Sequence, residues 1–148
     1  MTVQSGKVKI RRMPPPEEKA EEPFPDIERE SHLEVGRQGE KAAARYLWKK
    51  GYRIIERNYK AFRGEIDIIA EKAERLYFVE VKTRTSPHLA EPQERVDRVK
   101  KEHLRNAARY YLREFIEEPP AGYQFDVIAV LLDPQDGKPK LKHFPDAF

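Results

Sequence analysis

Two stretches with alternating polar and apolar residues occupy most of the segment from Gly64 to Thr83. They read Gly-Glu-Ile-Asp-Ile-Ile-Ala at 64–70 and Leu-Tyr-Phe-Val-Glu-Val-Lys-Thr at 76–83, and a period of two is typical of half-buried β-strands. The polar link at 72–75 suits a four-residue hairpin loop. The segment is therefore predicted to form two antiparallel β-strands joined by a hairpin loop. Alternation would place one set of side chains together on one face, namely Ile66, Ile68, Ala70, Tyr77, Val79, Val81 and Thr83.

The register of this hairpin would bring two acids together. If Glu71 faces Leu76, Asp67 faces Glu80, and Lys82 follows on the same face. Facing Cβ atoms lie about 5 Å apart, and a favourable cross-strand pair contributes only about 0.2–1 kcal/mol. Two unit charges at that distance repel by about 3 kcal/mol at an effective dielectric of about 20. A divalent cation would turn this repulsion into attraction, and carboxylate oxygens suit Mg²⁺ or Mn²⁺.

Two interpretations of the acid pair follow. In the first, Asp67 and Glu80 hold a metal ion, and Lys82 reaches the group that the ion activates. In the second, both carboxylates lie on a hydrated sheet face and pair with a nearby Lys or Arg. The spacing alone leaves both open.

The composition limits the class of protein. The 148 residues fit one domain with a tail, and the absence of cysteine excludes disulfides and thiolate metal sites. Neither a signal peptide nor a membrane span is visible, so we expect a soluble cytoplasmic protein. The formal net charge of +3 is only a weak indicator of nucleic-acid binding. Residues 1–30, with five prolines and blocks of charge, predict a disordered tail before a domain at 31–148.

The first helix is expected from Ser31 to about residue 50. Ser31 and Glu34 form a capping-box pattern, and Gly51 suits the C-terminal cap. Glu40 points with the apolar stripe, where a carboxylate needs a partner. It is either a third acid aimed at the metal site or an acid at the edge of the stripe that pairs with an Arg, such as Arg37.

The remaining elements complete an α-β-β-β-α-β-β order. Residues 52–59 predict a strand, and 60–64 a loop. A basic helix from about Asp97 to residue 117 should pack through a stripe that includes Val99 and His103, and Lys100 lies beside this stripe. The apolar run 123–132 suits a central parallel strand, with Asp126 not assigned to catalysis. A turn at 133–137 and an edge strand at 140–144 follow, which makes an α/β protein with a mixed central sheet flanked by helices.

Several short motifs in this order resemble the YraN-like family of predicted endonucleases, within the PD-(D/E)xK (restriction-endonuclease-like) superfamily. The resemblance covers residues 32–148 and rests on Gly-Arg-Gln-Gly-Glu-Lys-Ala-Ala at 36–43, Gly-Glu-Ile-Asp at 64–67, Phe-Val-Glu-Val-Lys-Thr-Arg at 78–84, Phe-Asp-Val at 125–127 and the final Ala-Phe. It implies a restriction-endonuclease-like fold. Residue 66 is Ile where the superfamily motif is named for Pro.

The resemblance also implies roles for individual residues. Asp67 and Glu80 match the metal-binding acids, with the Val81 carbonyl as a further ligand. Lys82 matches the catalytic lysine, and Glu40 the first-helix acid of resolvase-like members.

The expected function is a Mg²⁺- or Mn²⁺-dependent endonuclease that hydrolyses phosphodiester bonds in DNA, with branched or flapped structures among its candidate substrates. Contacts to the nucleic-acid backbone are expected from Arg63, Arg84 and Lys100. The alternative is a non-catalytic nucleic-acid-binding module of resolvase-like fold. No membrane partner is expected, and the oligomeric state stays open, a homodimer included.

Overall fold

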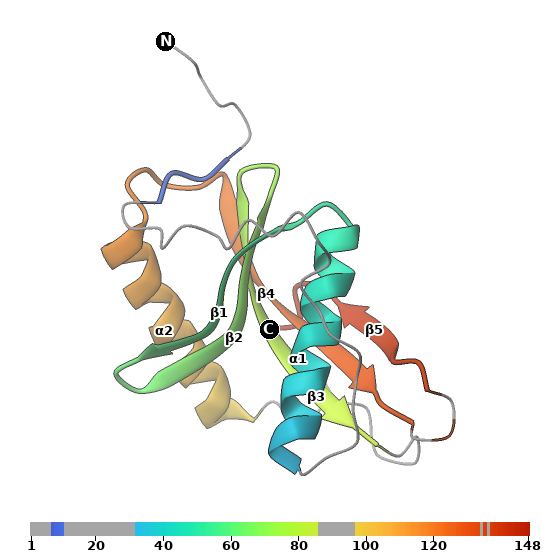
Figure 1. Ribbon diagram of the computed structural model, residues 1–148. Coiled ribbons are helices and arrows are strands. Elements are labelled where there is room, and N and C mark those ends of the chain that lie inside the picture. The colour runs from blue at the N-terminus through green and yellow to red at the C-terminus, as the bar shows by residue number, and fades with distance from the viewer. Residues whose placement is uncertain (1–6, 11–31, 86–96, 134, 136) are drawn as a thin grey trace.

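The computed structural model describes residues 7–10, 32–85, 97–133, 135 and 137–148. Two helices and five strands follow in the predicted order (Figure 1). They are α1 (His32–Lys49), β1 (Arg53–Ala61), β2 (Gly64–Lys72), β3 (Arg75–Arg84), α2 (Arg98–Phe115), β4 (Gly122–Leu131) and β5 (Lys140–Phe144). Among these residues, neither helix is long and apolar enough to cross a membrane.

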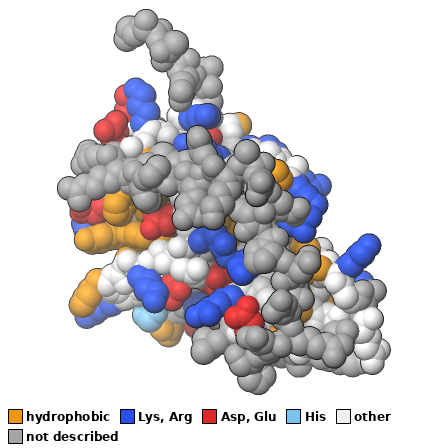
Figure 2. Space-filling view, viewed as in Figure 1, with side chains coloured by type: hydrophobic (Ala, Val, Ile, Leu, Met, Phe, Trp, Pro, Cys, Tyr) orange, Lys and Arg blue, Asp and Glu red, His pale blue; other side chains and the backbone are white. Residues whose placement is uncertain are grey.

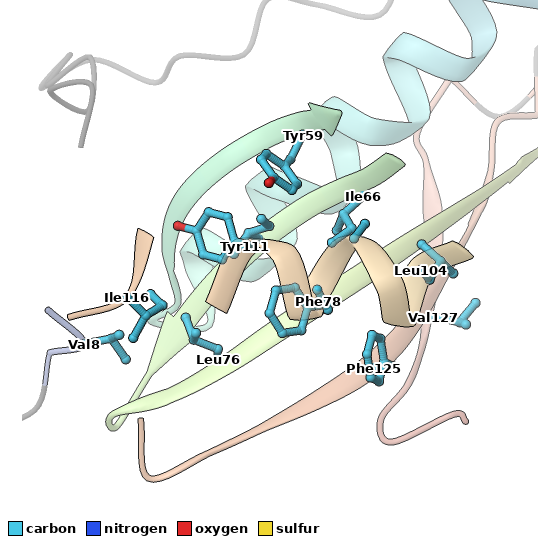
Figure 3. Close-up of a cluster of buried hydrophobic side chains, with 13 residues drawn as sticks. Val8, Tyr59, Ile66, Leu76, Phe78, Leu104, Tyr111, Ile116, Phe125 and Val127 are labelled. Carbon is cyan, nitrogen blue, oxygen red and sulfur yellow. The ribbon is translucent and has the colours of Figure 1, made fainter. Parts of the chain in front are cut away.

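The strands form one mixed sheet in the order β1-β2-β3-β4-β5, in which β3 and β4 are parallel and the other pairs antiparallel. The α2 side of the core includes Leu104, Tyr111 and Phe78 (Figure 3), and the α1 side includes Leu47 and Ile128. Because both faces of the central strands are covered by helices, β4 needs the continuous apolar run seen in its sequence.

The β2–β3 register is confirmed: Glu71 faces Leu76, and the pairing continues to Ile68 opposite Val79. The predicted four-residue loop is wrong, because the strands extend until only Ala73 and Glu74 connect them. These two residues have φ of 51° and 66°. Positive φ at both central positions is the type I′ geometry, whose twist matches that of the flanking strands.

The predicted sharing of one sheet face by Ile66, Ile68 and Ala70 is also wrong. Ile68 and Ala70 pack on the α1 side, whereas Ile66 packs on the α2 side with Ile69. Alternation is broken at Asp67, where the neighbouring β1 strand carries Asn58 with φ of 54°. Asn tolerates this left-handed conformation, and a single such residue in a strand re-aims the side chains around it.

Helix ends largely follow their local signals. Gly51, with φ of 91°, closes α1: its N–H donates to the Trp48 carbonyl and the Tyr52 N–H to the Leu47 carbonyl, both at 3.0 Å. The Ser31 cap lies outside the described residues. Asp97 caps α2, since its side chain accepts a hydrogen bond from the Lys100 N–H at 2.8 Å.

Residues 7–10 fall within the stretch predicted to be disordered, and the structure places them against the domain. Val8 is buried in the α2-side core, its N–H lies 3.3 Å from the Glu71 carboxylate, and its carbonyl accepts from Arg53 at 3.2 Å. Ile10 forms an antiparallel bridge with Ile116. For these four residues the structure differs from the prediction, because side chains far along the chain complete the backbone hydrogen bonds.

Candidate active site

The sheet forks where the predicted acid pair lies. The β2–β3 ladder ends at Ile68 and Val79, while β3 stays paired with β4 as far as Arg84 opposite Leu131. Figure 1 shows the β1–β2 hairpin turning away from β3. Past the end of the ladder, the Val81 N–H donates to Asp67 Oδ2 at 2.8 Å. Because the N–H and C=O of one strand residue point to the same side, the Val81 carbonyl also faces the fork.

A cleft of about 560 Å³ opens at this fork. Its lining comes from four elements: α1, β2, β3 and the first turns of α2. Acidic and basic side chains lie side by side on the face shown in Figure 2. The lining residues are Glu40, Gly64, Glu65, Asp67, Glu80, Asp97, Val99, Lys100, His103 and Leu104.

The start of β2 is held tightly against α2 by Gly64. A Cβ at this position would collide with the His103 carbonyl oxygen, so only glycine allows the approach. The predicted packing of Val99 and His103 is wrong: Val99 is 60% exposed, His103 is also exposed, and both line the cleft. The burial of α2 begins only at Leu104, because its first turns lie over the hollow and not over the sheet.

Asp67 and Glu80 form an electrostatically costly pair. The Glu80 side chain is only 4% exposed. Burial, and then the neighbouring Glu80 carboxylate, raise the pKa of Asp67 to about 8, although the Val81 N–H opposes the shift. Near neutral pH the pair therefore requires either a shared proton or a nearby cation.

Two lysines approach the same Glu80 oxygen. Lys82 Nζ lies 3.5 Å from Glu80 Oε1, and Lys100 Nζ contacts that atom directly. Burial and then the neighbouring Lys100 hold the pKa of Lys82 below its ordinary value, against the effect of Glu80. Burial also acts to lower the pKa of Lys100, but the contact with Glu80 outweighs it and leaves that pKa raised. Pairing with lysines, the second interpretation from the sequence, is thus realised for Glu80.

Glu40 reaches the cleft from α1. Burial raises its pKa, and a side-chain hydrogen bond with Asn58 and the charge of Arg57 partly offset that shift. The arginine that acts on Glu40 is Arg57 and not the suggested Arg37, whose Nη1 lies 3.8 Å from Glu34 Oε2. The acid from the first helix therefore lies with the acids of the fork.

The three residues predicted to contact nucleic acid, Arg63, Arg84 and Lys100, lie at different places relative to the cleft. Only Lys100 lies among the acids. Arg63 is exposed at the β1–β2 turn, with its guanidinium carbon 5.2 Å from the centre of the Phe62 ring, and Arg84 ends β3. Sequence reasoning missed Phe62, which is 83% exposed. A large aromatic residue in a turn, two positions before a glycine, was the available signal.

The fork offers carboxylate and carbonyl oxygens as possible ligands for a divalent metal ion. Among the described residues, no group of three or more His, Cys, Asp or Glu side chains is arranged to hold a metal ion. Mg²⁺, however, keeps several waters and is commonly held by one or two carboxylates together with substrate phosphates. Asp67, Glu80 and the Val81 carbonyl supply hard oxygen donors of that kind at the fork. The residues present therefore fit a Mg²⁺ or Mn²⁺ ion that shares its shell with water and substrate.

A forked five-stranded mixed sheet with a helix on each face defines an α/β protein of restriction-endonuclease-like fold. Residues 39–130 match the uncharacterised protein family UPF0102, which is the YraN-like family, and the chain belongs to it. The resemblance seen in the sequence motifs is thus confirmed.

Relatives from several organisms carry the same family description. The chain is 44% identical over 115 residues to the UPF0102 protein of Syntrophomonas wolfei, which covers 78% of this chain and 97% of the relative. It is 48% identical over 118 residues to that of Chlorobium limicola, with coverage of 77% and 91%. A relative from Chlorobaculum tepidum is 50% identical over 97 residues, with coverage of 66% and 74%.

Proposed function

We propose that this protein is a metal-dependent endonuclease that hydrolyses phosphodiester bonds in DNA. The proposal is carried by one observation: two acids from neighbouring strands converge at the fork of the sheet, and a lysine lies 3.5 Å from one of them. Such a pair is unfavourable for stability alone and is well suited to a hard cation.

The acids and the backbone of the fork would hold the ion. Asp67, Glu80 and the Val81 carbonyl are the direct ligands, and Glu40 binds through water or completes a second position. When bound, the ion would act as a Lewis acid and as a template for the phosphate. The Val81 N–H keeps the Asp67 carboxylate pointed into the fork, so one ligand is already oriented.

In the proposed reaction, Lys82 acts as the general base for the attacking water. Burial lowers the pKa of Lys82 and so increases the fraction of the side chain that is neutral, and in this form it can take a proton from that water and then carry positive charge beside the phosphate. In the reaction the water oxygen forms a new P–O bond and one ester P–O bond breaks. A hydroxyl end and a phosphomonoester result, and the leaving oxygen gains a proton. Arg63, Arg84 and Lys100 would contact the backbone without reading its sequence.

The test is cleavage of labelled linear, nicked, flapped and four-way DNA with Mg²⁺ or Mn²⁺, with RNA versions alongside. We expect Glu80→Ala and Lys82→Ala to lower the rate by at least about 10²-fold. Lys49→Ala is the matched control, since Lys49 is exposed in the last turn of α1. Cleavage that is equally fast in all three variants would assign the activity to another site or to a contaminant.

A second candidate is a nucleic-acid-binding module without catalysis. It is favoured by the contact between Lys100 and Glu80, because a lysine already neutralises the acid that the metal would need. A binding module would shift DNA equally well with a chelator present and cut none of the substrates. An enzyme would cut only with metal.

A further inference from the structure

The contact between Lys100 and Glu80 joins two separate elements across the cleft. Lys100 lies in the first turn of α2. Its backbone N–H donates a hydrogen bond to Oδ1 of the N-cap residue Asp97 at 2.8 Å. Its side chain is 42% exposed, whereas that of Glu80 is 4% exposed. One partner is therefore buried in the fork, and the other enters from the solvent side.

The charges of the cleft explain why a lysine is drawn there. The negative charges of Glu40 and Glu80 both act to raise the pKa of Asp67, and that of Glu80 also acts to raise the pKa of Glu40. Lys82 and Lys100 both form an ion pair with the same atom, Glu80 Oε1. The proposed metal ion would bind that oxygen too. Lys82 and Glu80 are neighbours on β3, so that lysine remains beside its acid. Lys100 belongs to another element and has a flexible four-carbon stem, so it can leave without moving the sheet.

We infer that Lys100 is the counter-cation of the metal-free site, and that it competes with a divalent cation for Glu80. This inference rests on the proposed metal site and goes beyond it. The contact of Lys100 with Glu80 and the contact of a metal ion with the same oxygen exclude each other. Once displaced, the ammonium group is available at the mouth of the cleft, where a backbone phosphate would enter. Metal binding thus releases the Lys100 ammonium group to contact the substrate. Before the metal ion binds, Lys100 stays paired with Glu80 and does not contact a phosphate.

The test is Mn²⁺ affinity of the full chain without nucleic acid, measured by isothermal titration calorimetry and checked by electron paramagnetic resonance. Lys100→Met removes the competing charge and keeps most of the stem. We expect it to bind Mn²⁺ about tenfold more tightly than the wild type, which is roughly 1.4 kcal/mol.

Lys101→Met is the matched control. It makes the same change in net charge one residue away, where the ammonium lies 5.7 Å from the centre of the Phe148 ring. Screening should hold its effect to about twofold. Lys100→Arg keeps the positive charge and should bind Mn²⁺ nearly as the wild type does. It serves as a second variant if the methionine protein folds poorly.

Thermal denaturation supplies an independent readout. Without metal, Lys100→Met should melt below the wild type, and saturating Mn²⁺ should raise its melting temperature by more, because tighter binding to the folded state stabilises it by mass action. Affinity that is unchanged or weaker in Lys100→Met would overturn the competition while leaving the metal site in place. Mn²⁺ binding to none of the proteins would overturn the metal site and the inference together.

Discussion

Asp67 shows how a single carboxylate is held under opposing influences at the fork. The Val81 N–H at 2.8 Å favours its charged form, whereas burial and Glu80 disfavour it and raise its pKa to about 8. An unfolded aspartate has a pKa of about 3.9. The folded protein therefore retains a proton that the unfolded chain releases across this interval.

The sign of the pH dependence follows from that difference. Where the native state binds more protons than the unfolded state, stability falls as pH rises. The contribution of Asp67 to stability in the metal-free protein should thus decline from about pH 4 to about pH 8. Asp67→Asn keeps an acceptor for Val81 and removes the charge. It should raise the free energy of unfolding by about 1–2 kcal/mol at alkaline pH, and this gain should shrink as the pH falls towards about 4. Urea unfolding at acidic and alkaline pH checks this, and a less stable variant at alkaline pH would contradict the paired-acid geometry.

Asp126 is an instructive contrast, since it is fully buried without being strained. Its carboxylate accepts hydrogen bonds from Gln124 Nε2 at 2.7 Å and the Asp146 N–H at 2.9 Å, and His143 Nε2 lies 2.7 Å away. Burial acts to raise its pKa, yet these partners outweigh burial and lower it. The partners of Asp126 outweigh its burial, whereas the partners of Asp67 and Glu40 do not outweigh theirs.

At the scale of elements, the β1–β2 hairpin extends past the fork and ends in an aromatic–basic pair. Ala61 pairs with Gly64, so Phe62 and Arg63 occupy a two-residue turn. Gly64 and Glu65, which follow directly, already line the cleft. An exposed ring with a stacked guanidinium suits an unpaired base next to a phosphate.

Phe62→Ala should therefore weaken binding to single-stranded or flapped DNA by about 1–3 kcal/mol, the range of one lost base stack. Its melting temperature should stay at the wild-type value because the ring is 83% exposed. Fluorescence anisotropy in the inactive Lys82→Ala background measures the affinity. Trp48→Ala is the control, since Trp48 is 54% exposed near the end of α1. Equal losses in both variants would indicate nonspecific stacking and no role for the hairpin.

For the whole molecule, residues 7–10 connect the sheet to the end of α2. Glu71 and Arg53 form an ion pair at 2.7 Å, and both also bond the backbone of Val8. The Glu117 N–H donates to the Lys9 carbonyl at 3.1 Å. Figure 1 shows this segment beside the C-terminal end of α2. The cleft is lined by residues from the N-terminal end of the same helix.

Val8→Ala should destabilise the protein by about 1–2 kcal/mol, because a 7% exposed side chain loses most of its apolar burial. Cleavage at temperatures far below melting should be unaffected, since the segment is remote from the acids. Lys7→Ala, at an exposed position beside it, is the control for urea unfolding. Identical midpoints for the two variants would show that the docking of Val8 contributes nothing to stability.

The sequence by itself determined the kind and order of the elements, the register from Glu71 opposite Leu76, and the family. These depend on local patterns: the period of two, helix caps such as Asp97, and short motifs. The same patterns placed Asp67, Glu80 and Lys82 on neighbouring strands, and their chemical roles stay predictions.

Only the tertiary structure decided where the sheet forks, which face Ile66 takes, and which residues meet across the cleft. The break at Asn58 and Asp67 reverses an alternation that the sequence predicts as continuous. Lys100 meets Glu80, and Val8 meets Glu71, through folding that brings together residues distant in the chain. The periodic pattern around a residue indicates whether it belongs to a helix or a strand. Its contact partners and its exposure depend on how the other elements pack around it.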